Sequence, residues 1–176
     1  MLTAGAPVAE EGLFARLESL GVPYVLHRHP PVFTVAEARA LRGTLPGAHV
    51  KNLFLRDKRK SLWLVTVLED RPVDLKALRA ALQAKGNLSF GSADLLMERL
   101  GVVPGAVTPF GIVNDREGVV SVVLDRAVLA LNPVNAHPLR NDMTVAVSPQ
   151  DLLRFLEAEK HAPAILDFDS IGLTPG

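Results

Sequence analysis

Two apolar segments that flank a charged turn, residues 49–56 and 62–68, constrain the fold of this chain more than any other feature. Side chains alternate along a strand, which places residues 50, 52 and 54 on one face of the first segment and residues 51, 53 and 55 on the other. Both faces then carry large apolar groups, as in a strand that is covered on both sides. We therefore expect a hairpin that lies inside a sheet, with the charged segment 56–60 at its tip.

Lys51 is the one lysine inside the first of these apolar segments. It shares its face with Leu53 and Leu55, so its ammonium group is expected to be partly removed from water. An ammonium group in such a place either pairs with an anion or reaches water along its flexible stem. Lys51 is therefore a candidate anion-binding residue.

The composition is that of one globular domain. The chain has 176 residues, of which 48% are hydrophobic and 22% charged, and it contains no cysteine. The absence of cysteine excludes disulfides, thiolate nucleophiles and cysteine-ligated zinc. No run approaches the roughly 18 apolar residues of a membrane span, and the first ten residues lack the pattern of a signal peptide. We expect a cytoplasmic protein without a membrane partner, with one domain over residues 1–170 and a C-terminal tail over 171–176.

The charge balance limits the partners. Nineteen basic and nineteen acidic residues give a formal net charge of zero, whereas a protein that coats DNA or RNA needs a basic excess. A local nucleic-acid contact is still compatible with this balance. The densest basic cluster is residues 56–60, and such a cluster is ordinarily a solvated hairpin tip.

Strands that alternate with helices and are joined mostly through hairpins predict a single domain of the α+β class with a mixed sheet. Thr34 and Glu37 form a capping box at the start of one helix. Helices are expected over 10–20, 34–42, 74–86, 92–100 and 150–159, and strands over 23–27, 49–56, 62–68, 87–91, 119–124, 127–131, 143–147 and 164–168.

Two loops carry the remaining candidate chemistry. Residues 101–111 contain three glycines and two prolines but no charge, so this loop is expected to pack against the core or to line a pocket. Residues 132–141 form a polar loop around His137, which is either a general base or a structurally satisfied histidine. The sequence lacks the G-x-S-x-G, P-loop and G-x-G-x-x-G motifs, and its histidines lack the H-E-x-x-H spacing. We therefore expect neither a catalytic metal nor another cofactor.

Three passages together resemble the YbaK/ProX family of aminoacyl-tRNA editing domains, which is related to the insertion domain of bacterial prolyl-tRNA synthetases. They are His29-Pro-Pro-Val-Phe-Thr-Val-Ala-Glu-Ala38, His49-Val-Lys-Asn-Leu53, and Gly105-Ala-Val-Thr-Pro-Phe-Gly111 followed by Asn135-Ala-His-Pro138. The first passage resembles the freestanding Ala-tRNA(Pro) deacylases more than the Cys-tRNA(Pro) deacylases. The resemblance extends over most of the chain, from His29 to the helix after Ser148. It implies a mixed, mostly antiparallel, barrel-like sheet with surrounding helices.

The resemblance implies roles for individual residues. Lys51 matches the family's essential strand lysine, which implies an anchor for phosphate or ribose at the tRNA acceptor end, and His137 matches a histidine near the aminoacyl pocket. The loop that matches the family's G-x-x-x-P motif would orient the terminal adenosine and the ester. The implied substrate-binding residues are Phe33, Thr34, Asn52, Gly105, Ala106, Val107, Thr108, Pro109, Phe110 and Gly111.

The reaction implied by this resemblance is hydrolysis of the ester that joins alanine to tRNA(Pro), with help from the vicinal ribose hydroxyl of the substrate. A pocket that rejects proline by size would act as the second sieve of double-sieve editing. The implied partners are the acceptor end of tRNA(Pro) and, further, prolyl-tRNA synthetase, and the basic residues of 56–60 are candidates for a contact with the acceptor stem. Three alternatives remain open: a deacylase for Cys-tRNA(Pro) or another aminoacyl-tRNA, a noncatalytic module that binds tRNA or a nucleotide, and a metal hydrolase, whose activity a chelator would abolish.

Overall fold

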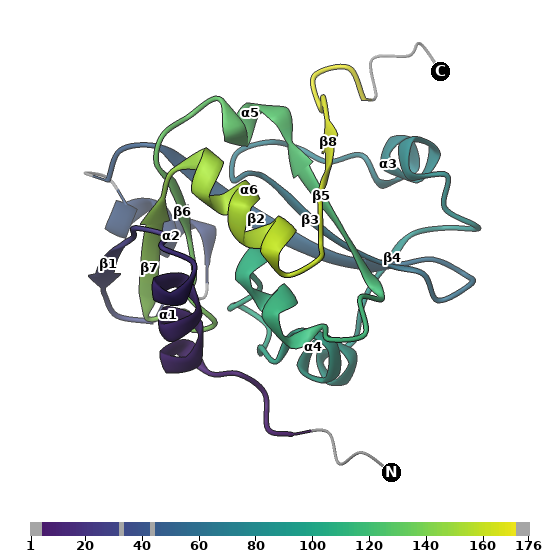
Figure 1. Cartoon of the computed structure of the whole chain (residues 1–176). Coiled ribbons are helices and arrows are strands. Elements are labelled where there is room, and N and C mark those ends of the chain that lie inside the picture. The colour runs from purple at the N-terminus through teal and green to yellow at the C-terminus, as the bar shows by residue number, and fades with distance from the viewer. Residues whose placement is uncertain (1–4, 32–33, 43–44, 172–176) are drawn as a thin grey trace.

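A computed structural model describes residues 5–31, 34–42 and 45–171 (Figure 1). Its helices are α1 (Glu10–Ser19), α2 (Val35–Arg42), α3 (Leu75–Leu82), α4 (Ala93–Leu100), the 3-10 helix η1 (Pro109–Asn114), α5 (Arg126–Leu129) and α6 (Pro149–Ala158). Its strands are β1 (Val25–Arg28), β2 (Ala48–Arg56), β3 (Leu62–Leu68), β4 (Ser89–Phe90), β5 (Val120–Asp125), β6 (Val134–Ala136), β7 (Met143–Val147) and β8 (Ala164–Leu166).

The eight strands form one mixed sheet in the open order β1-β7-β6-β2-β3-β5-β8, with β4 paired to β2. Pairing is antiparallel for β1–β7, β6–β7, β2–β3 and β2–β4, and parallel for β2–β6, β3–β5 and β5–β8. The predicted α+β class and the mixed, mostly antiparallel sheet are confirmed. The predicted hairpin of β2 and β3 lies at the centre of this order, so both of its strands are interior strands.

Side chains on the two faces of the β2–β3–β5 region belong to two hydrophobic clusters, as the alternation of apolar residues predicts. Phe54 and Leu64 belong to the larger cluster, to which α1, α4 and α6 contribute, and α6 lies across this face of the sheet in Figure 1. Leu55 and Val65 belong to the smaller cluster, which includes Leu78 of α3. The strands are thus covered on both sides, which explains why they read as apolar throughout.

Helix capping follows the sequence signals closely. The backbone N–H of Glu37 donates to Thr34 Oγ1 at 3.1 Å, and the N–H of Thr34 donates to Glu37 Oε2 at 3.2 Å, so the capping box is formed. The side chains of Ser92 and Ser148 likewise accept N–H groups at the starts of α4 and α6. Local sequence therefore determines where these helices begin.

The structure corrects three expected elements. The segment 127–131 is not a strand, because the Asp125 side chain accepts the N–H of Ala127 and starts helix α5 there. The polar loop 132–141 contains strand β6, which pairs with β2 and β7. Helix α3 ends at Leu82 rather than continuing to Gly86, because the next residue, Gln83, takes a left-handed conformation.

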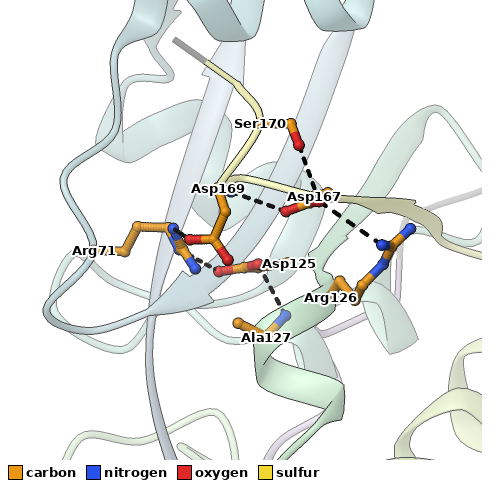
Figure 2. Close-up of polar contacts among 7 residues, drawn as sticks. All are labelled: Arg71, Asp125, Arg126, Ala127, Asp167, Asp169 and Ser170. Atoms are coloured by element: carbon orange, nitrogen blue, oxygen red, sulfur yellow. Dashed lines mark hydrogen bonds and ion pairs between the residues drawn. The ribbon is translucent and has the colours of Figure 1, made fainter. Parts of the chain in front are cut away.

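An ionic cluster ties the C-terminal segment to the sheet (Figure 2). Arg71, just after β3, donates from Nε to Asp125 Oδ2 at 2.6 Å and from Nη1 to Asp169 Oδ1 at 2.8 Å. Asp167 in turn accepts from the backbone N–H of Asp169 and from the Ser170 hydroxyl. The cluster therefore links the end of β3, the start of α5 and the residues that follow β8.

None of the described helices is long and apolar enough to cross a membrane.

Candidate functional site

Lys51 and Asn52 leave the middle of β2 on opposite faces of the sheet. Lys51 lies opposite Val67 in the β2–β3 register and is half-buried, on the face that carries the smaller hydrophobic cluster. Within residues 5–31, 34–42 and 45–171, no hydrogen bond or ion pair joins its ammonium group to another side chain. The ammonium group is therefore available to an anionic ligand.

Asn52 connects β2 to the glycine- and proline-rich loop. Its Nδ2 donates to Val107 O at 3.0 Å, and its Oδ1 accepts from the Thr66 hydroxyl at 2.6 Å. Thr66 is fully buried in β3, so the amide of Asn52 is held from both sides. Asn52 is thus fixed as a link between the centre of the sheet and the loop.

The edge of β2 beside Asn52 faces no strand formed by the described residues. On this edge β6 pairs with β2 at residues 48–49, and β4 pairs with it at residues 55–56. The N–H of Ala48 donates to Pro133 O, and the carbonyl of Phe54 accepts from Gly91, which shows that even-numbered residues turn their backbone groups to this edge. The alternation places the N–H and C=O of Asn52 on the same edge, between β6 and β4. In the described part of the chain these two groups have no strand partner, so they can bond to a ligand.

The loop 101–111 packs against the core only in part, because Val103, Pro104 and Gly105 are exposed. Within residues 105–111, Gly105 is exposed and Val107 is half-buried, whereas the other five residues are buried. Thr108 Oγ1 accepts the N–H of Phe110 and caps η1, and the Phe110 ring packs edge-on against Phe155 with centroids 5.3 Å apart. Direct ligand contact is therefore open to Gly105 and Val107, while the buried residues hold the loop in place: Ala106, Thr108, Pro109, Phe110 and Gly111.

His137 follows β6 and has a defined tautomer. Its Nδ1 lies 2.7 Å from Met143 O, so Nδ1–H donates to this carbonyl and Nε2 carries the lone pair. Burial lowers the pKa of His137 below its ordinary value, against the opposing effect of the Met143 carbonyl. The imidazole is therefore neutral near pH 7, with Nε2 able to accept a proton or a hydrogen bond.

His29 lies beside His137, an arrangement that the sequence analysis did not predict. The two ring centroids are 6.2 Å apart, and His29 Nε2 accepts from the Thr144 hydroxyl at 2.9 Å. The only sequence signal for this proximity is that both residues fall in the passages that resemble the editing family. His29 is thus a further candidate for the wall of the aminoacyl pocket.

Gly105 lies close to the His137 loop. A Cβ atom on Gly105 would lie 3.9 Å from the side chain of Asn141, four residues after His137. Asn52 reaches the glycine- and proline-rich loop from the sheet, but among the residues described here no hydrogen bond or ion pair joins Lys51 to that loop or to His137. Thr34 is exposed at the start of α2, and Phe33 lies outside the described residues.

A cavity of about 390 Å³ opens beside the start of β2 and the end of β3. His49 of β2 and Glu69, the residue after β3, lie opposite each other. They are two residues along the chain from Lys51 and Val67, respectively. The loop after β3, including Arg71 of the ionic cluster, forms another wall. The lining residues are Gly47, His49, Leu68, Glu69, Asp70, Arg71, Pro72 and Leu131.

Among all the described residues, no His, Asp and Glu side chains form a group of three that could hold a metal ion.

Comparison with known proteins shows a consistent set of relatives. The chain matches the family model of the aminoacyl-tRNA editing domain over residues 29–155. It is 42% identical over 170 residues to prolyl-tRNA synthetase associated domain-containing protein 1 of Mus musculus, with 94% of this chain and 99% of that protein covered. It is 37% identical over 151 residues to prolyl-tRNA editing protein ProX of Acetoanaerobium sticklandii, with 85% and 92% covered.

The fold comparison agrees with these matches. The structure superposes with a TM-score of 0.69 on the crystal structure of a candidate trans-editing enzyme for prolyl-tRNA synthetase, covering 90% of this chain and 94% of that chain. The sequence identity in this superposition is 20%, so it bears on the fold alone.

Proposed function

Because the chain belongs to the family of aminoacyl-tRNA editing domains, we propose that it is a trans-editing hydrolase that removes alanine from mischarged tRNA(Pro). The observation that carries this proposal is the pair Lys51 and Asn52. One residue offers a half-buried ammonium group without an ion pair in the described chain, and the next binds the loop that is similar to the family's G-x-x-x-P motif. A site with an anion anchor and polar positioning groups suits a substrate that supplies its own reactive hydroxyl.

Lys51 anchors the acceptor end by pairing with a phosphate or ribose oxygen. An ammonium group on a largely apolar face is less screened than one in bulk water, so its attraction for phosphate is strengthened. The backbone N–H and C=O of Asn52, with Gly105 and Val107 of the loop, then orient the terminal adenosine and the ester. Backbone groups that are fixed before the substrate arrives cost little reorganisation when charge develops in the transition state.

In the proposed reaction a water molecule attacks the carbonyl carbon of the aminoacyl ester. The new carbon–oxygen bond forms as the bond to the ribose oxygen breaks, and that oxygen leaves with a proton. The vicinal ribose hydroxyl positions and activates the water, and His137 Nε2 accepts a hydrogen bond from the aminoacyl group. No covalent intermediate with the protein is required.

Alanine is selected by exclusion of larger side chains. A pocket that attracts one amino acid over another by a single methylene gains only about 1–3 kcal/mol, whereas a pocket too small for the ring of proline rejects it by steric clash. The same logic leaves Cys-tRNA(Pro) as the second substrate to test, because cysteine is also smaller than proline.

The decisive experiment measures deacylation of Ala-, Cys- and Pro-tRNA(Pro) by the purified protein. We expect rapid loss of alanine and retention of proline. Faster hydrolysis of Cys-tRNA(Pro) would reassign the specificity. If the protein binds tRNA but hydrolyses none of these esters, it is a binding module and the enzymatic proposal fails.

Substitution of Gly105 by alanine is expected to lower deacylation at least tenfold. Gly105 has φ +91°, which strains any residue with a Cβ by about 1 kcal/mol, and the new methyl group would also point toward Asn141. Gly118→Ala is the matched control, because Gly118 has φ +67° and an added Cβ meets nothing within 4 Å. Both variants should lose similar stability in urea denaturation. Equal activity in the two variants would remove Gly105 from the site.

The pH dependence of kcat/KM should report His137. Because burial lowers its pKa below 6.5, kcat/KM should rise with pH through that lowered value and be flat above about pH 6.5. The His137→Ala variant should have lower activity and lose this acidic limb. An unchanged limb in the variant would assign the titration to a group other than His137.

A further inference from the structure

Five cations gather around the tip of the β2–β3 hairpin, outside the proposed site. Four come from the tip and the fifth follows α3; together they are called the basic tip, and all are exposed: Arg56, Lys58, Arg59, Lys60 and Lys85. The sequence predicts the first four as neighbours, but Lys85 is 25 residues beyond Lys60 in the chain. The fold therefore builds a denser positive surface than the sequence run alone indicates.

The buried carboxylate of Asp57 holds the two segments together. Its Oδ1 accepts the N–H groups of Arg59 and Ser61 at 2.9 and 3.0 Å, and its Oδ2 accepts the N–H of Lys85 at 2.8 Å. The N–H of Lys58 donates back to Lys85 O at 2.8 Å. The backbone N–H of Lys85 is the main cause that lowers the pKa of Asp57. The one acidic side chain of the tip thus faces inward, while the cations face water.

Charge is distributed unevenly between the basic tip and the rest of the chain. The tip holds five of the nineteen Lys and Arg residues and one of the nineteen Asp and Glu residues, so the remainder carries fourteen basic and eighteen acidic residues. None of the five tip cations forms an ion pair with a described residue, whereas Arg71, Arg99 and Arg140 each pair with two carboxylates. A neutral protein therefore carries a local surface that fits a polyanion.

The distance between the basic tip and Lys51 indicates which part of a substrate can contact the tip. Lys51 and Arg56 are five residues apart on one strand, which separates them by about 17 Å. A terminal nucleotide bound at Lys51 is too short to extend over the whole tip, whereas the phosphates of the adjoining duplex can. We propose that the basic tip binds the phosphate backbone of the tRNA acceptor stem while Lys51 holds the aminoacyl end. This inference rests on the proposed function.

The test compares two double variants with the same change of net charge. Lys58→Glu with Arg59→Glu alters the tip, and Arg116→Glu with Lys160→Glu alters two exposed cations elsewhere that form no ion pair with a described residue. Binding of uncharged tRNA(Pro) is measured against salt concentration. The tip variant should bind tRNA at least tenfold more weakly. The negative slope of the logarithm of the association constant against the logarithm of the salt concentration should become shallower by about 1.5, which is roughly 0.7–0.9 for each phosphate that the protein no longer neutralises. The control should stay within twofold of the unmodified protein.

A second measurement separates this inference from the proposed function. The tip variant should deacylate full-length Ala-tRNA(Pro) at least tenfold more slowly, yet hydrolyse a short alanylated oligonucleotide ending in CCA at the unmodified rate. Equal losses in both double variants, or an unchanged salt slope, would overturn the role of the basic tip. Tip-dependent binding to vesicles containing phosphatidylserine, without binding to tRNA, would also overturn it. If the tip binds tRNA but no ester is hydrolysed, the proposed function fails and the basic tip stands.

Discussion

Replacement of Lys51 by alanine is expected to lower kcat/KM for Ala-tRNA(Pro) deacylation by about a hundredfold. A hydrogen bond from a charged group contributes about 1.5–3 kcal/mol, and about 2.7 kcal/mol of lost transition-state stabilisation corresponds to a hundredfold change in rate. Because Lys51 has no ion pair within the described chain, its removal leaves no carboxylate unpaired. The free energy of unfolding should therefore stay the same or rise slightly, since a charge leaves a partly apolar face.

The control for this variant is Lys76→Ala, which removes an exposed lysine from α3 on the same side of the sheet. Its deacylation rate should stay within twofold of the unmodified protein. A Lys51→Ala protein that is equally active would show that the strand lysine takes no part in the reaction. A large loss of stability would instead indicate that Lys51 supports the fold.

Replacement of His161 by alanine is expected to destabilise the protein by about 3 kcal/mol, the ordinary cost of removing one partner from a buried ion pair. His161 Nε2 lies 2.8 Å from Asp115 Oδ2, and the two side chains are only 3% and 1% exposed. His161 Nδ1 lies 2.6 Å from Glu159 O. Because both ring nitrogens face acceptors, both must carry hydrogen, and the histidine is an imidazolium in the folded protein.

The pair makes stability depend on pH in a defined window. The hydrogen bond to Asp115 raises the pKa of His161 above 6.5, so its contribution is complete below pH 6.5 and is lost as pH rises through the folded value. Burial alone would raise the pKa of Asp115, yet the hydrogen bonds from His161 and from two backbone N–H groups hold it below 3.8. Its contribution is therefore present above pH 3.8 and lost as pH falls through the folded value. The pair stabilises the fold most between about pH 4 and 6.5.

Urea denaturation at pH 6 and pH 9 checks this prediction. The unmodified protein should lose stability between these values, and His161→Ala should lose much less. His27→Ala is the control, because His27 is half-buried on β1 and has no side-chain hydrogen bond within the described residues. A pH dependence that persists in His161→Ala would assign it to a different group.

Features set by neighbouring residues could be predicted from the sequence. The β2–β3 hairpin follows from apolar alternation on both sides of a charged tip, and the starts of α2, α4 and α6 follow from capping side chains. Lys51 was identifiable because a cation in an apolar strand conflicts with its surroundings. The packing of the uncharged loop was predictable for residues 106–111, because an apolar loop makes a poor solvent surface, but residues 103–105 are exposed.

Features set by distant residues could not be predicted in the same way. The segment 127–131 is apolar enough for a strand, but a helix starts there at Asp125, whose carboxylate is held by Arg71 from 54 residues earlier in the chain. The proximity of His29 to His137 depends on β1 pairing with β7, and that of Lys85 to Lys58 depends on a single buried carboxylate. Periodicity carries no information about such contacts, because they join segments that are far apart in the chain.

The ionic cluster around Arg71 has a practical consequence for shortened or tagged forms of the protein. Deleting the chain from Asp167 onward would take away Asp169 and leave the Arg71 guanidinium with Asp125 alone. Arg71 also forms part of the wall of the cavity beside the start of β2, so a truncation that spares every strand would still loosen that wall. Affinity tags are therefore better fused to the N-terminal end, ahead of α1, than to the C-terminal end.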